Sequence, residues 1–140
     1  MQHQQQSLSV SQREALKQQF LADKIYTGLQ DLNAGFDAPG IKYFSKEDFE
    51  IVLDRAEKLH LWITGIEPWY KDGDDYEFFG CKTLDEVIPD WDPEATAYSS
   101  DFPRQAFQAF QDEALGKGIT LMYSASFCIK EAQLLVAAEA

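Results

Sequence analysis

Apolar residues recur every three or four positions in three stretches of the chain, which predicts three amphipathic helices. The first begins at a capping box formed by Ser11 and Glu14, the second at Ser45, and the third at Ser100 or Asp101. We expect the first helix to end near residues 33–35 and the third at residues 116–118, because glycine favours helix ends. The apolar stripes of the three helices are, in order, Leu16, Phe20, Leu21, Ile25, Leu29 and Leu32; Phe49, Val52, Leu53, Ala56 and Leu59; and Ala106, Phe107, Phe110, Ala114 and Leu115.

Shorter apolar runs between these helices predict strands at residues 61–66, 76–81 and 119–122. The Asp72-Gly73 pair is a turn signal between the first two strands, which indicates a hairpin. A second capping box, at Thr83 and Glu86, predicts a helix of about one turn before Pro89. Residues 131–139 are predicted to form a weak terminal helix.

A helix followed by a strand occurs twice, at residues 45–66 and 101–124. This order favours an α+β fold: a single domain at residues 11–140, with a small mixed β-sheet and amphipathic helices packed on one face. Residues 1–10 are expected to be a flexible leader. The residues expected to be buried between sheet and helices are Phe49, Leu53, Ile63, Phe107, Phe110, Ile119 and Leu121.

The sequence predicts a cytoplasmic protein. Its 140 residues suit one domain, the N-terminus lacks the pattern of a signal peptide, and no apolar run approaches the ~20 residues of a membrane span. The two cysteines, Cys81 and Cys128, are not in a C-x-x-C motif and are expected to be reduced.

Negative charge is concentrated in residues 67–101, which hold eleven carboxylates and two lysines, or −9 of the net charge of −12. The same segment holds seven large aromatic residues. Disordered acidic tails lack such residues, so the segment is expected to be folded surface. Acids around apolar anchors favour docking onto a basic protein and disfavour nucleic acid or an anionic membrane as partner. The alternative is a solvated face that only aids solubility.

No catalytic or cofactor-binding motif is found, and the sequence predicts a protein that is not an enzyme and has no cofactor or metal. His60 is the only histidine in the body of the chain, at a predicted helix–strand junction. The segment from Asp75 to Glu86 resembles a calcium loop in its glycine and final glutamate, but Phe79 has no oxygen at a ligand position. A carboxylate pair with hydrolase chemistry stays an alternative.

Two segments are predicted to form one partner-binding surface, because acids and aromatics coincide there without a helical stripe: residues 69–77 and 90–94. If they lie side by side, three aromatic residues form its centre and the acids its rim. The predicted residues are Trp69, Tyr70, Asp72, Asp74, Asp75, Tyr76, Glu77, Asp90, Trp91, Asp92 and Glu94.

Four short motifs resemble the small bacterial immunity proteins of polymorphic and contact-dependent toxin systems. They are Tyr43-Phe44-Ser45-x-x-Asp48-Phe49, Gly65-Ile66-Glu67-Pro68-Trp69, Trp91 followed by a helix, and Gly118-Ile119-Thr120-Leu121. The resemblance implies a single-domain, acidic, cytoplasmic protein that is not an enzyme and neutralises one cognate toxin, of which nucleases are one class. The alternatives are a regulatory or scaffold module that binds another basic protein, a small hydrolase, and a structural subunit that self-associates.

Overall fold

The computed structural model describes residues 8–139, and the side chains of residues 8–137. Most of the predicted leader, residues 1–7, lies outside the described residues. The chain forms two compact units: residues 8–27 with 129–139, and residues 28–128. The α+β fold class is confirmed, and the second unit holds the sheet and every residue of the predicted partner surface.

The first unit consists of α1 (Val10–Phe20), the π-helical turn η1 (Leu21–Ile25) and α5 (Glu131–Glu139). The capping box is formed by Ser9 and Gln12, two residues before the predicted one. The helix also ends earlier than predicted, at Ile25, so Leu29 and Leu32 are not helical. Gly28, with a φ of +79°, has a left-handed conformation that does not continue a helix.

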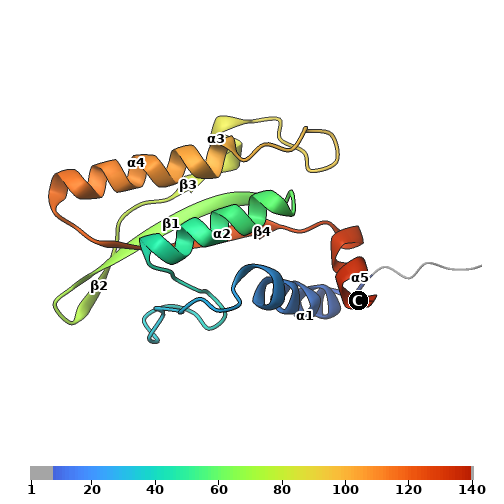
Figure 1. Ribbon diagram of the computed structural model, residues 1–140, viewed down its shortest axis with the longest axis horizontal. Helices are drawn as coiled ribbons and strands as arrows, with labels where there is room; N and C mark the ends of the chain where they lie inside the picture. The colour runs from blue at the N-terminus through green and yellow to red at the C-terminus, as the bar shows by residue number, and fades with distance from the viewer. Residues whose placement is uncertain (1–7, 140) are drawn as a thin grey trace, which may run out of the picture. The chain divides into compact units, whose positions relative to one another are not determined.

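In the second unit, the long strand β1 (Trp62–Asp72) is the centre of the sheet. It pairs along residues 62–70 with β4 (Leu121–Cys128). Its opposite edge pairs with β2 (Asp75–Phe78) and β3 (Lys82–Thr83). All of these pairings are antiparallel, so the sheet is antiparallel rather than mixed. Figure 1 shows the β1–β2 hairpin projecting at one end of the sheet.

Helices α2 (Lys46–Lys58) and α4 (Asp101–Lys117) cover the same face of the sheet, as predicted. The rings of Phe49 on α2 and Phe107 on α4 are 5.3 Å apart, and both contact Tyr123 of β4. Arg104 joins the helices on their outer side, with its Nη2 2.7 Å from carboxylate oxygens of Asp54 and Glu57.

The core prediction is confirmed for six of its seven residues: Phe49, Leu53, Ile63, Phe107, Phe110 and Leu121 are buried, while Ile119 is half-buried. Two residues of the predicted stripes are exposed instead. Leu59 follows the last residue of α2 and is 40% exposed. Leu115 is 82% exposed, because it lies about 100° around the helix from the buried Ala114.

A single helical turn, α3 (Leu84–Val87), follows β3. Its predicted capping box is confirmed, with Glu86 Oε1 accepting a hydrogen bond of 3.2 Å from the Thr83 N–H. The irregular segment 88–100 then leads to Ser100, which precedes α4. None of the helices described in residues 8–139 is long and apolar enough to cross a membrane.

Candidate functional site

The predicted partner-binding residues lie at opposite ends of β1. Residues 69–77 form the β1–β2 hairpin, whereas Trp91 lies 5.5 Å from Trp62, the first residue of β1. A strand of eleven residues spans about 35 Å. The structure therefore does not bring the two segments together, and the expectation of one patch centred on Trp69, Tyr70 and Trp91 is wrong. Figure 1 shows the hairpin and the segment after α3 at different ends of the sheet.

Within the hairpin, the strand register separates aromatic from acidic side chains. Residues directly opposite each other on antiparallel strands share a face, and side chains alternate along each strand. The register pairs Trp69 with Phe78, Tyr70 with Glu77, Lys71 with Tyr76, and Asp72 with Asp75. One face therefore carries Trp69, Lys71, Tyr76 and Phe78, and the other carries Tyr70, Asp72, Asp75 and Glu77. We call these the aromatic face and the acidic face of the hairpin.

The aromatic face is partly covered by Phe36, which lies in the loop between η1 and α2. The Phe36 ring stacks on Tyr76 at 4.1 Å and contacts Trp69 at 5.4 Å. Phe78, 5.8 Å from Trp69, is 53% exposed. The Lys71 ammonium lies 5.8 Å from the centre of the Tyr76 ring. Most of this face is therefore engaged within the fold.

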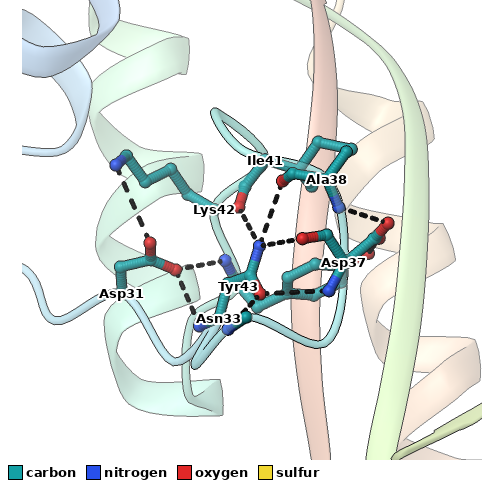
Figure 2. A network of polar contacts seen from close by, with 8 residues as sticks. Asp31, Asn33, Asp37, Ala38, Ile41, Lys42 and Tyr43 are labelled. Carbon is teal, nitrogen blue, oxygen red and sulfur yellow. Dashed lines mark hydrogen bonds and ion pairs between the residues drawn. The ribbon is translucent and has the colours of Figure 1, made fainter.

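Side-chain hydrogen bonds hold the segment that carries Phe36 in place (Figure 2). The amide nitrogen of Asn33 donates to the carbonyls of Ile41, at 2.9 Å, and Ala38, at 3.3 Å. Asp31 accepts from the Tyr43 N–H at 3.1 Å and pairs with Lys42 at 3.7 Å. These bonds join the two ends of the loop, and so hold Phe36 in position against the hairpin.

Tyr43 connects this loop to the sheet. Its hydroxyl donates to Asp37 and lies 3.4 Å from Glu67, which also accepts from the Trp69 indole N–H at 2.8 Å. Burial, reinforced by the neighbouring Asp37 and Glu67 carboxylates, raises the pKa of Tyr43 well above its ordinary value. Tyr43 therefore keeps its proton. Trp69 is half-buried with its polar edge satisfied, which makes it a structural anchor of this region.

The acidic face of the hairpin borders a groove of about 880 Å³. Tyr70 and Asp72 are the predicted residues that line it. The apolar part of its lining includes Tyr70, Ala114, Leu115 and Leu121, and its polar part includes Lys46, Glu47, Gln108, Gln111 and Asp112. The groove thus combines an apolar surface with charged and amide groups from three different elements.

Local backbone geometry positions the walls of this groove. Ser45 caps α2, its hydroxyl accepting from the Asp48 N–H at 3.2 Å, and so places Glu47 in the first turn. Gly118, with a φ of +66°, ends α4 in a left-handed conformation that suits glycine. The chain then turns into β4, which brings Leu121 opposite Tyr70. The Tyr70 ring also packs edge-on against the Phe79 ring, with 6.2 Å between their centres.

The segment around Trp91 has a different character. Trp91 packs edge-on against the buried Trp62, and its indole nitrogen is buried without a hydrogen-bond partner in the described part of the chain. Tyr98 also packs on Trp62, at 5.1 Å, and stacks on His60 at 4.7 Å. Trp91 is therefore a packing residue rather than an exposed anchor.

The acids of this second segment are exposed and form turns. Asp92 Oδ1 accepts from the Glu94 N–H at 2.9 Å, and the Asp92 N–H donates to Thr96 at the same distance. Asp90 and Glu94 are also exposed. These contacts account for the local backbone of the segment.

Within residues 8–139, no group of three or more His, Cys, Asp or Glu side chains lies close enough to hold a metal ion. Desolvation, with a contribution from Glu67 and Glu86, raises the pKa of the exposed Cys81 thiol, which favours its protonated and unreactive form. His60 is stacked on Tyr98 rather than directed at a nucleophile.

Comparison with protein-family models, curated proteins and solved structures found no match for the chain. The site is therefore defined by its geometry alone. Sequence reasoning missed Phe36, Phe78, Asp112 and the exposure of Leu115. Phe78 was within reach of the sequence, because alternation places it on the same face as Trp69 once the turn is fixed. Asp112 carried no local signal.

Proposed function

We propose that the protein is a bacterial immunity protein, which binds and neutralises a cognate toxin domain that has a basic surface. The observation that carries the proposal is the acidic face of the hairpin, where three exposed carboxylates stand beside the half-buried Tyr70 and a groove. A nuclease is the toxin class that fits best, because its phosphate-binding cleft is cationic. The motif resemblance described above supports the same assignment.

The net charge supports this mode of action. A charge of −12 on 140 residues repels nucleic acid and anionic lipid, and attracts a cationic protein from a distance. Carboxylates grouped on one face accelerate the encounter with the partner, and apolar groups at the centre of the contact slow its release. Inhibition then requires occupation of the toxin's cleft and no chemistry by this chain.

Co-expression with the protein encoded by the adjacent gene, as the candidate toxin, tests the proposal. We expect restored growth of the host and a stable complex that co-purifies at a 1:1 ratio. A variant with Asp72→Asn, Asp75→Asn and Glu77→Gln should protect less well than a variant with Asp90→Asn, Asp92→Asn and Glu94→Gln, which carries the same net charge. Turnover of a substrate by the isolated chain, abolished by one carboxylate substitution, would contradict the proposal.

A further inference from the structure

The groove beside Tyr70 is large enough to receive part of another molecule. Its volume of about 880 Å³ falls within the ~300–1,000 Å³ of clefts that bury ligand groups. Leu115 lines the groove and is 82% exposed. The opening therefore offers apolar surface that the fold of residues 28–128 leaves accessible to solvent.

The charges around the opening indicate the sign of its occupant. Glu47, Asp72 and Asp112 line the groove, against Lys46 and Lys71. The Lys71 ammonium lies over the ring of Tyr76, on the aromatic face of the hairpin, so its charge is directed away from the groove. Two further carboxylates, Asp75 and Glu77, stand on the same face of the hairpin as Asp72. The groove is therefore negative at its hairpin end.

The uncharged polar groups indicate a peptide. Gln108 and Gln111 from α4 line the groove. The amide nitrogen of Gln108 donates to Asp112 at 2.8 Å, and an amide side chain such as that of Gln111 can both donate to and accept from a peptide backbone. Tyr70 offers a ring to a cationic side chain, in the way that Phe79 and Phe110 already receive Lys117 and Lys82, at 5.4 and 5.2 Å.

We propose that the groove binds a basic peptide segment of the partner protein, with an arginine or lysine side chain placed over Tyr70 and facing Asp72 and Asp112. The segment belongs to the toxin, so the inference rests on the proposed function. The guanidinium group of arginine suits this site best, because it stacks on a ring and also donates to carboxylates. The apolar part of the segment contacts Leu115 and Leu121.

The test uses the ¹⁵N-labelled full-length chain and a blocked arginine–glycine hexapeptide, titrated at low salt and followed by NMR. We expect the largest shift changes in residues 70–72, 111–115 and 118–121. Asp72→Asn combined with Asp112→Asn should weaken the binding about fivefold to tenfold, from the loss of two partly exposed ion pairs. Asp90→Asn combined with Asp92→Asn, with the same change of net charge, should weaken it less than about twofold.

A second pair of variants tests the apolar contact. Leu115→Ala should weaken binding of the hexapeptide about threefold, whereas Val87→Ala, which is also an exposed apolar residue, should leave it unchanged. Both positions are exposed, so these variants are expected to fold, as their NMR spectra will verify.

The proposal is overturned if the two double-aspartate variants lose affinity equally, or if the shift changes spread over residues 90–94. Equal affinity for spermidine would show attraction of any cation and overturn the peptide assignment. A dimer of the chain that Leu115→Ala dissociates would make a second copy the occupant, with the same consequence. If the hexapeptide binds as expected but no toxin is neutralised, the groove is a peptide-binding site and the proposed function is wrong. If a toxin is neutralised but the hexapeptide does not bind the groove, the proposed function is retained and the groove is not the interface.

Discussion

The hairpin at residues 69–78 and the segment at residues 90–98 have similar compositions and opposite architectures. Both are rich in acids and aromatic residues. In the hairpin, strand alternation places carboxylates on one face and rings on the other, and a groove opens beside the carboxylates. In the second segment, Trp91 and Tyr98 pack on Trp62 and the acids remain at turns. Acidic–aromatic composition therefore has two structural meanings in one chain.

The difference follows from backbone regularity. A strand holds successive side chains on alternate faces. A sequence in which acidic and aromatic residues alternate therefore forms one acidic face and one aromatic face. Gly73, with a φ of +64°, occupies the first central position of the two-residue turn and fixes the register between Asp72 and Asp75. An irregular segment has no such rule. Its apolar side chains pack against the core and its polar side chains remain exposed to solvent. This stabilises the loop but does not group its charges on one face.

The largest effect on stability is expected in the core between the two regions. Phe107 is 6% exposed and contacts both Phe49 and Tyr123. Phe107→Ala should lower the free energy of unfolding by about 3–5 kcal/mol, as is usual for a buried aromatic residue. Urea unfolding monitored by circular dichroism measures this value. A loss below about 1 kcal/mol would contradict the packing of α2 and α4 on one face.

Trp91 and Phe78 distinguish the two regions directly. Trp91→Ala should destabilise the protein by about 2 kcal/mol, because the half-buried ring packs on Trp62. Phe78→Ala should cost less than about 1 kcal/mol, because this ring is 53% exposed. Trp91→Phe is the control: it keeps most of the packing and removes the buried, unpartnered indole N–H, so it should cost less than Trp91→Ala. Equal losses of unfolding free energy for Trp91→Ala and Phe78→Ala would contradict the description of Trp91 as a packing residue and of Phe78 as an exposed one.

The helix–strand units, the hairpin turn and most of the core could be predicted from the sequence, because each depends on local periodicity or on turn residues. The environment of Trp69 could not, because it depends on Phe36 and Tyr43, which reach it through a loop without periodicity. The separation of the two acidic segments depends on the length of β1. The predicted strand ended at residue 66, whereas β1 continues to Asp72.

Alkaline titration compares the tyrosines that anchor the two regions. The pKa of Tyr43, near the hairpin, and that of Tyr98, beside Trp62, are both raised, chiefly by burial. The folded state therefore retains protons that the unfolded state loses above pH 10, so stability is intact below pH 10 and falls as the pH rises.

Each such tyrosine steepens this fall by at most about 1.4 kcal/mol per pH unit. Tyr43→Phe and Tyr98→Phe should both make the fall less steep, and the effect of Tyr43→Phe should extend to higher pH. The measurement is the urea midpoint at a series of pH values above 9. An unchanged slope in Tyr43→Phe would contradict the burial of this hydroxyl between Asp37 and Glu67.

We propose that the acids of the hairpin, and not those of residues 90–94, meet the partner. The most direct test is the association rate with the toxin domain, measured by stopped flow at several salt concentrations for the two matched triple variants. Neutralising Asp72, Asp75 and Glu77 should slow association about fivefold to tenfold at low salt and flatten its salt dependence, while neutralising Asp90, Asp92 and Glu94 should change it less than about twofold. Equal slowing by both variants would mean that the hairpin acts only as part of the general negative charge, and would contradict its assignment as the partner-binding surface.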